Sequence, residues 1–231
     1  MLKTLKFKGS DKDFFFSSDL HIGQSCSSWE NPLWKMRGYD SIESHKEGVV
    51  ESWNEHCSAQ SICFHLGDMV FEDPYGEKFI DLVYSLNFKE LYCYWGNHTS
   101  GQSVIYKRRL ENLYPDVAAA GLEVYPLQME LIEGKKIIFL PQYADIQING
   151  TFIAAGHYPI ISHNRLGKNS LHLSGHSHNG CKLTNKDLGR GKRLDVGWDG
   201  WAKPVSLAEV KEHLKDRDMD SPDHHDSNCG I

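Results

Sequence analysis

The chain of 231 residues lacks a long hydrophobic run, and no stretch approaches the ~20 apolar residues that a membrane helix needs. Its first sixteen residues also lack the apolar segment and cleavage site of a signal peptide. The six cysteines lie far apart without a CxxC pair, a spacing more typical of reduced thiols than of a disulfide framework or structural zinc site. These absences predict a cytoplasmic protein with no membrane partner.

An excess of positive charge is also missing. The formal net charge of −6 argues against extended binding to nucleic acid or to an anionic membrane. It leaves a small phosphorylated substrate open, because bound metal ions would reverse the local field. Hydrophobic and charged fractions of 40% and 24% are ordinary for a globular protein. We expect a single domain over residues 1–214 and a polar, disordered tail over residues 215–231.

The first half of the chain alternates between strand and helix patterns. Short apolar runs predict strands at residues 13–18, 61–66 and 91–95, and helical spacing predicts helices at residues 42–57, 74–86 and 103–114. This alternation favours parallel strands joined by crossover helices. The second half shows few helices and several strand-like pieces, at residues 122–132, 135–140, 151–155, 170–174 and 193–196. Together they predict two sheets packed against each other with helices outside.

Five short motifs with metal-binding side chains each follow one of these apolar runs. They are Asp19-Leu20-His21, Gly67-Asp68, Gly96-Asn97-His98, Gly156-His157 and Gly175-His176-Ser177-His178. Sites in α/β sheets assemble at the carboxyl ends of strands. A Gly-Asp pair alone is an ordinary turn. All five motifs in this order, each behind a strand-like run, are a strong signal for a metal site.

The spacing within the motifs has a physical reason. Residues i and i+2 of extended backbone point the same way, so we expect Asp19 and His21 to reach one ion, and His176 and His178 likewise. A glycine precedes four of the motif residues and removes a side chain where the backbone must turn beside the metals. Imidazole nitrogens with carboxylate oxygens suit zinc, manganese or iron.

With these motifs, the sequence resembles the calcineurin-like metallophosphoesterase family, whose pattern is DxH, GD, GNH(D/E), GH and GHxH. The resemblance is strongest to small single-domain members from bacteria and phages, and runs from about Phe14 to Ser206. It implies a four-layer αββα sandwich of two mixed β-sheets flanked by helices. It also implies two divalent metal ions (Mn²⁺, Fe²⁺/Fe³⁺ or Zn²⁺). The implied ligands are Asp19, His21 and His178 for one ion, Asn97, His157 and His176 for the other, and Asp68 bridging both.

The resemblance implies hydrolysis of phosphoesters, with diesters slightly favoured, by a hydroxide that two metals ~4 Å apart activate. His98 is similar to the catalytic histidine of the family, whose role is to stabilise or protonate the leaving oxygen. Position 99 departs from the pattern, because Thr99 stands where the family has Asp or Glu. Either another acid, such as Glu72 or Asp73, substitutes in space, or His98 is a weaker acid.

Three alternatives stay open: a phosphomonoesterase, a nuclease acting on single-stranded ends, and a catalytically weakened scaffold that binds metal. The net charge and the lack of an aromatic and basic run argue against the nuclease. The complete ligand set argues against the scaffold.

For several histidines and tryptophans outside the motifs, we expect a structural role rather than a functional one. We expect His65 and His172 to be hydrogen-bonded core histidines and His45 to lie on a helix surface. Four tryptophans are expected in the core rather than in a base-stacking wall, namely Trp29, Trp34, Trp198 and Trp201.

Overall fold

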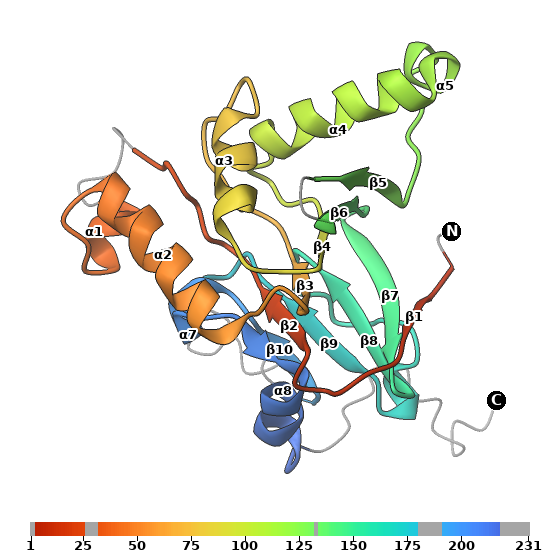
Figure 1. Cartoon of the computed structure of the whole chain (residues 1–231). Helices are drawn as coiled ribbons and strands as arrows, with labels where there is room; N and C mark the ends of the chain where they lie inside the picture. The colour runs from red at the N-terminus through yellow and green to blue at the C-terminus, as the bar shows by residue number, and fades with distance from the viewer. Residues whose placement is uncertain (1–2, 26–31, 132–133, 180–190, 218–231) are drawn as a thin grey trace.

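The structure is a computed structural model that describes residues 3–25, 32–131, 134–179 and 191–217 (Figure 1). Its strands form a six-stranded sheet of order β11-β2-β3-β4-β6-β5 and a five-stranded sheet of order β1-β7-β8-β9-β10. Each sheet contains both parallel and antiparallel pairs. The predicted α/β architecture, two mixed sheets packed together and flanked by helices, is confirmed.

The six-stranded sheet has four parallel strands in its centre and an antiparallel strand at each edge. The parallel strands are β2 (Phe14–Ser17), β3 (Ile62–His65), β4 (Glu90–Cys93) and β6 (Lys136–Phe139). The edge strands are β5 (Leu127–Glu130) and β11 (Val205–Ser206). Between the parallel strands the chain crosses over through α2 (Ile42–His56), α3 (Glu77–Ser85) and α4 (Ser100–Leu113). Parallel strands joined in this way end at the same edge of the sheet.

The five-stranded sheet comes mostly from the second half of the chain. Its strands are β1 (Leu5–Phe7), β7 (Tyr143–Ile148), β8 (Thr151–Gly156), β9 (Leu171–Ser174) and β10 (Arg193–Asp195). β7 and β8 form a hairpin whose turn, Asn149-Gly150, has φ angles of 51° and 86°, as a tight Asn-Gly hairpin requires. β8, β9 and β10 are parallel, so their carboxyl ends also meet at one edge.

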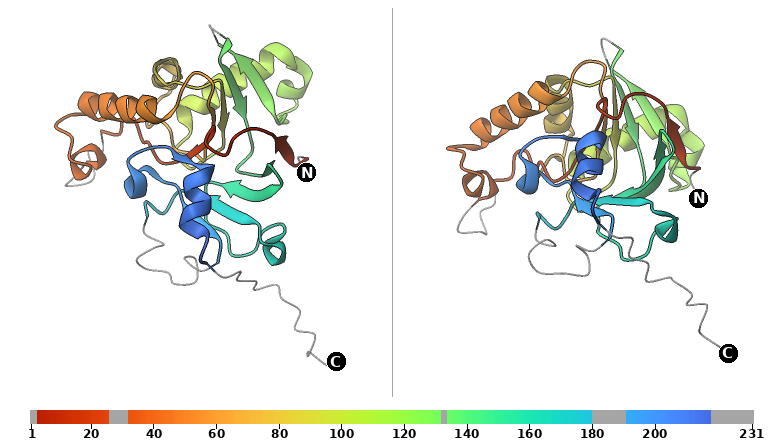
Figure 2. Two further views of the ribbon diagram at one scale, coloured as in Figure 1. Left: turned by 60° about the horizontal axis from the view of Figure 1, so that its bottom comes forward. Right: turned by 90° about the horizontal axis from the view of Figure 1, so that it is seen from below.

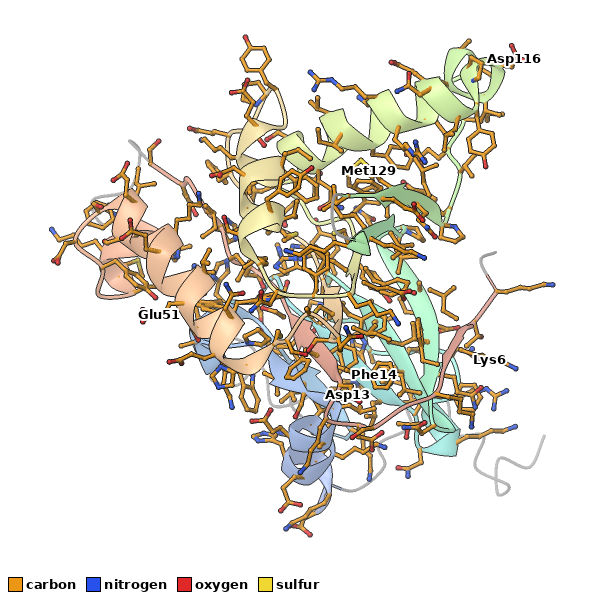
Figure 3. The ribbon with its side chains drawn as sticks, viewed as in Figure 1. Lys6, Asp13, Phe14, Glu51, Asp116 and Met129 are labelled. Atoms are coloured by element: carbon orange, nitrogen blue, oxygen red, sulfur yellow. The ribbon has the colours of Figure 1, made fainter. Side chains whose placement is uncertain are left out.

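Both faces of the central strands are buried. On β2, Phe15 packs with Trp53 of α2 and Phe79 of α3, whereas Phe14 and Phe16 belong to the core between the sheets. Figure 3 shows Phe14 inside the molecule, with Glu51 of α2 on the outside. Strands buried on two faces require continuous apolar runs, which explains why the sequence reveals them so clearly.

The remaining helical segments are short. They are α1 (Leu33–Met36), α5 (Pro115–Ala119), η2 (Leu166–Lys168), α7 (Trp198–Trp201) and α8 (Leu207–Leu214). α8 buries three apolar side chains in the core between the sheets, and Figure 2, which turns the bottom of Figure 1 toward the viewer, shows it near the middle of both views. Within the described residues, no helix combines the length and the apolar character that crossing a membrane requires.

Several predicted boundaries are wrong. The strand expected at residues 122–132 is reduced to β5 (Leu127–Glu130), and the helix expected at residues 74–86 begins at Glu77 because Gly76 has φ 79°. β1, β7, β11 and α8 were not anticipated. β7 buries every second side chain, the pattern of a strand covered on one face.

The domain boundaries stay a prediction, and the cysteine prediction is tested in part. α8 ends at Leu214, the predicted end of the domain, but most of the expected tail (215–231) lies outside the described residues. Cys57, Cys63 and Cys93 are buried free thiols, as expected, and the other three cysteines lie outside the described residues.

Candidate metal centre

The two sheets bring all five motifs together. Asp19, Asp68 and Asn97 follow the carboxyl ends of the neighbouring parallel strands β2, β3 and β4, and the histidine motifs follow β8 and β9. Backbone hydrogen bonds tie the loops to one another, from Asp19 N–H to the Gly67 carbonyl (3.1 Å) and from Gly175 N–H to the His157 carbonyl (2.9 Å). The motifs of both sheets therefore face a common site.

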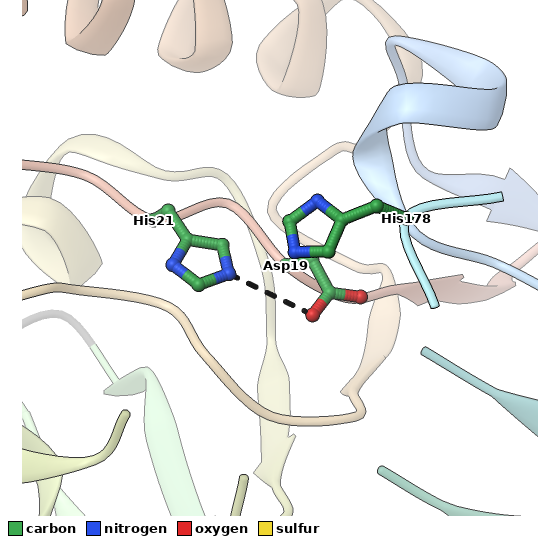
Figure 4. A group of neighbouring side chains, drawn as sticks. All are labelled: Asp19, His21 and His178. Carbon is green, nitrogen blue, oxygen red and sulfur yellow. Dashed lines mark ion pairs between the residues drawn. The ribbon is translucent and has the colours of Figure 1, made fainter. Parts of the chain in front are cut away.

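One group of candidate ligands consists of Asp19, His21 and His178 (Figure 4). A ligand atom from each lies within 4.8 Å of the others. Nε2 of His21 lies 3.8 Å from Oδ1 of Asp19. This is the set that the family resemblance implies for one ion.

Asp68 lies between the two halves of the centre. Its Oδ2 is 3.6 Å from Nε2 of His21 and 3.5 Å from Nε2 of His157. Asp19, Asp68 and His157 form a second group of ligand atoms within 4.8 Å of one another. The other carboxylate oxygen of Asp68, Oδ1, accepts a hydrogen bond from the backbone N–H of His98 at 2.8 Å. This position fits a carboxylate that bridges two ions.

Asn97 lies against two imidazoles. Its Oδ1 is 2.8 Å from Nε2 of His157 and 3.0 Å from Nδ1 of His176. Nδ1 of His157 donates to the carbonyl of Leu66 at 2.9 Å, so Nε2 of the neutral ring carries a lone pair. A lone pair aimed at an amide oxygen is unfavourable unless a cation binds both. The arrangement fits the second metal position.

Several buried polar atoms at the centre have no hydrogen-bond partner among the described residues. They include Oδ1 of Asp19 and both ring nitrogens of His21, although Asp19 and His21 are 0% and 4% exposed. Leaving a buried acceptor unsatisfied costs about 1–3 kcal/mol, more when it is charged. Nitrogen and carboxylate donors of this kind suit Zn²⁺, Mn²⁺ or iron. The residues present thus fit a pair of divalent cations.

The backbone reasoning behind the paired motifs is wrong. Asp19, His21, His176 and His178 have φ angles of 59°, 51°, 65° and 47°, in the left-handed region rather than in extended backbone. As a result His178 joins Asp19 and His21, whereas His176 turns to Asn97. Such conformations cost of order 1–3 kcal/mol each in non-glycine residues and cluster at functional sites.

The glycines of the motifs leave no room for a side chain. A Cβ on Gly96 would lie 2.0 Å from Oδ1 of Asp68, and one on Gly175 would lie 2.5 Å from Oδ2 of Asp19. At these positions the lack of a side chain permits the carboxylates of Asp68 and Asp19 to approach the backbone, whereas the metals themselves stay a prediction.

The electrostatics of the centre follow from burial and from neighbouring ligands. Burial alone would raise the pKa of Asp19, but the nearby His21, His157 and His178 outweigh it and hold that pKa below its usual value. Burial lowers the pKa of His98 and His176. The shifts of Asp19 and His176 favour the deprotonated forms, which are the forms that bind metals.

An outer network orients His178, and the sequence did not reveal it. Nδ1 of His178 lies 2.6 Å from Oδ2 of Asp199, whose hydrogen bond raises the pKa of that histidine. The guanidinium of Arg37 donates to both oxygens of Asp199 (2.9 and 2.8 Å) and to the carbonyls of Asp19 and Leu20 (both 2.7 Å). Arg37 therefore connects Asp199, which orients the candidate ligand His178, to the backbone of a second candidate ligand, Asp19.

His98 stands at the edge of the centre, half-buried, with its ring 4.6 Å from that of Phe71. Among the described residues its imidazole has no hydrogen-bond partner. Asp73 does not replace the missing acid, because its Oδ2 accepts the N–H of Phe79 at 2.9 Å in the first turn of α3. Glu72 instead lies near the hydroxyl of Ser25, at 3.4 Å.

Expectations for histidines outside the motifs are partly wrong. His172 is buried and hydrogen-bonded to Ala154 and Ile160, as expected. His65 is buried, but neither ring nitrogen has a partner in the described part of the chain. His45 is on α2 but only 1% exposed, because it packs against Tyr39 and lies 3.1 Å from Arg37.

The tryptophan predictions have mixed outcomes. Trp198 is buried in a hydrophobic cluster and Trp201 packs against the other, as expected for core residues. Trp34 is half-buried on α1. Trp29 lies outside the described residues.

Comparisons with known proteins bear on the fold alone. No protein-family model and no curated protein matches the chain. Among solved structures, the chain is similar to a protein of unknown function, AQ665 from Aquifex aeolicus, with 14% sequence identity and a TM-score of 0.52. The similarity covers 87% of this chain and 98% of the other.

Proposed function

We propose that the chain is a calcineurin-like metallophosphoesterase that hydrolyses phosphoesters, with diesters slightly favoured over monoesters, at a centre of two divalent metal ions. The observation that supports this most directly is the convergence of seven side chains from two sheets around buried lone pairs that have no partner among the described residues. Such lone pairs are costly in a folded protein unless a cation binds them.

Two divalent cations at this centre would acidify water and neutralise charge on the phosphoryl oxygens. The residues of the chain supply the rest of the chemistry. Asp68 holds the two halves of the centre together and fixes the backbone of His98 through the 2.8 Å hydrogen bond. His98 is then placed to donate a proton from its ring to the leaving oxygen, a contribution typically worth ~10²–10⁴-fold in rate.

The test is hydrolysis of bis-p-nitrophenyl phosphate and p-nitrophenyl phosphate by Mn²⁺-loaded protein. We expect turnover of the diester by wild type and its loss in Asp68→Asn and His98→Ala. The matched controls are Asp116→Asn and His56→Ala, which change the same residue types at exposed positions outside the centre.

Metal analysis and labelled oligonucleotides separate the alternatives. Two ions per chain without turnover of either ester would overturn the proposal and favour a metal-binding scaffold. Degradation of single-stranded ends that outpaces the small esters would favour the nuclease. Faster hydrolysis of p-nitrophenyl phosphate than of the diester would favour a phosphomonoesterase.

A further inference from the structure

A cavity of about 560 Å³ opens directly beside the metal centre. Gly96 and Thr99 line it, and they flank Asn97 and His98 in the sequence. Gln142 also lines it, and its carbonyl accepts the N–H of the candidate ligand His157 at 3.3 Å. A group attached to a phosphorus atom at the metals would therefore extend into this cavity.

Aromatic rings held in place by hydrogen bonds line the cavity. Trp95 donates its indole N–H to the hydroxyl of Tyr125, and Tyr143 donates its hydroxyl to Oδ1 of Asp145 at 2.7 Å. The buried ring of Tyr106 stacks on Tyr125 with centroids 5.4 Å apart. Trp95, Tyr125 and Tyr143 are only half-buried, so they present ring surface to a ligand at little further cost in side-chain entropy.

Polar side chains complete the lining. The carboxylate of Glu123 and the ammonium of Lys107 are exposed, and neither makes a hydrogen bond or ion pair within the described residues. The carboxylate of Glu123 accepts hydrogen bonds and the ammonium of Lys107 donates them, whereas the side-chain amide of Gln142 can do both. A flat ligand with donors and acceptors on its edge would satisfy these groups, whereas a plain phenyl ring would not.

From these contacts we infer that the cavity binds the heteroaromatic base of a nucleoside, so that the substrate class is a phosphoester of a single nucleoside. This inference rests on the proposed function for the phosphoester bond. The size of the cavity is typical of sites for small ligands, roughly 300–1,000 Å³. A net charge of −6 opposes the binding of a long polyanionic strand, which favours a single nucleoside over a nucleic acid.

A binding experiment tests the inference without any turnover. Calorimetry on metal-loaded protein compares adenosine, guanosine, cytidine and uridine with ribose, none of which carries a phosphoester. Stacking of a base on aromatic side chains is worth ≈1–3 kcal/mol, so we expect at least one nucleoside to bind ~10-fold or more tightly than ribose. Equal binding of ribose and all four nucleosides, or tighter binding of N-acetyltyrosinamide, would overturn the inference.

Variants locate the binding to the cavity. Tyr143→Leu is expected to remove the advantage of the nucleoside, and the exposed Tyr114→Leu to keep it. Glu123→Ala, at an exposed position, is expected to weaken the binding of the preferred nucleoside without disturbing the fold. An unchanged nucleoside preference in both Tyr143→Leu and Glu123→Ala would overturn the assignment to this cavity.

Kinetics separate this inference from the proposed function. The p-nitrophenyl ester of thymidine 5′-phosphate and methyl p-nitrophenyl phosphate release the same leaving group. We expect kcat/KM to be ~10-fold or more higher for the nucleoside ester, and Tyr143→Leu to reduce that ratio. Turnover of both at equal kcat/KM would overturn the inference and leave the proposed function standing. No turnover of either ester would overturn the proposed function, even if nucleosides bind.

Discussion

The chemistry of the centre depends on single residues whose surroundings determine what they can do. His21 is the clearest case, because both of its ring nitrogens are buried without a hydrogen-bond partner among the described residues. A histidine in that state is an ordinary core residue only at a considerable cost in unsatisfied polar atoms. Next to Asp19 and Asp68, the same ring is a candidate ligand for a cation.

The first prediction concerns Asp199. Asp199→Asn removes the carboxylate that both orients His178 and accepts two hydrogen bonds from Arg37. Partners of this kind typically contribute ~10–100-fold to metal affinity, so we expect a loss of that order at one of the two metal positions. Competition with a chelating dye measures it, and Asp116→Asn is the control. Unchanged affinity for both ions would contradict the orienting role.

A second prediction concerns Thr99, where the resemblance leads one to expect an acid. Because neither Glu72 nor Asp73 contacts the ring of His98, we expect Thr99→Asp to orient that ring and improve its proton donation. The gain should be on the order of tenfold for a diester with a poor alkyl leaving group, and smaller for p-nitrophenyl esters. The comparison of kcat/KM for the two ester types measures it. Equal rates for wild type and variant on the alkyl diester would exclude this role.

At the scale of elements, α2 and α8 each begin after a serine whose side chain caps the first turn of the helix. α2 starts after Ser41, whose hydroxyl accepts the N–H of Ser44 (3.1 Å) while the hydroxyl of Ser44 accepts the N–H of Ser41 (2.9 Å). α2 matters for the site because it carries His45, which lies against Arg37. The start of the helix and the orientation of His178 are thus linked through three contacts, from His45 to Arg37, from Arg37 to Asp199 and from Asp199 to His178.

A third prediction tests this helix start. Ser41→Ala removes the side-chain acceptor at the N-cap and should lower the free energy of unfolding by about 1 kcal/mol. Ser41→Asp restores an acceptor and should keep most of the stability. Urea denaturation measures both variants. A loss of equal size in Ser41→Asp would show that the cap is not the stabilising contact.

At the scale of the whole molecule, the candidate ligands come together only because two sheets end at the same place. Strands β2, β3 and β4 supply three ligand loops, and β8 and β9 supply two more. The core between the sheets keeps these edges together, through contacts such as the ring of Phe7 on β1 against that of Phe64 on β3, with centroids 5.4 Å apart. Loosening this core would separate the two halves of the centre.

A fourth prediction concerns the pH dependence of global stability. Burial lowers the pKa of His172 on β9 from 6.5 to about 4, so the unfolded chain binds a proton more readily than the folded one. The stability is therefore full above pH 6.5 and declines as the pH falls from 6.5 towards 4. Between pH 6.5 and 5 the expected loss is about 2 kcal/mol, since one pKa unit is worth about 1.4 kcal/mol.

Urea denaturation at pH 7 and pH 5 measures this loss. His172→Gln should show a shallower pH dependence, whereas the exposed His56→Gln should behave like wild type. Parallel pH dependences for His172→Gln and wild type would rule out His172 as the cause.

The sequence by itself determined the candidate ligands and the first sheet. Continuous apolar runs identify strands buried on both faces, and residues just after such runs lie at a sheet edge whatever the rest of the chain does. For this reason Asp19, Asp68, Asn97 and the four histidines His21, His157, His176 and His178 were identified as candidates without the structure. The turn at Asn149-Gly150 was recognised too, although the alternating strand before it was missed.

Only the tertiary structure decided the contacts between distant residues. Arg37 and Asp199 lie 162 residues apart, and no local pattern connects them. Tertiary contacts also decide the burial of His45 and the left-handed backbone that separates His176 from His178. The same holds for the aromatic cavity of Trp95, Tyr125 and Tyr143. Each depends on which segments pack together, because periodicity along the chain reports the face that a residue occupies but not its partner across the fold.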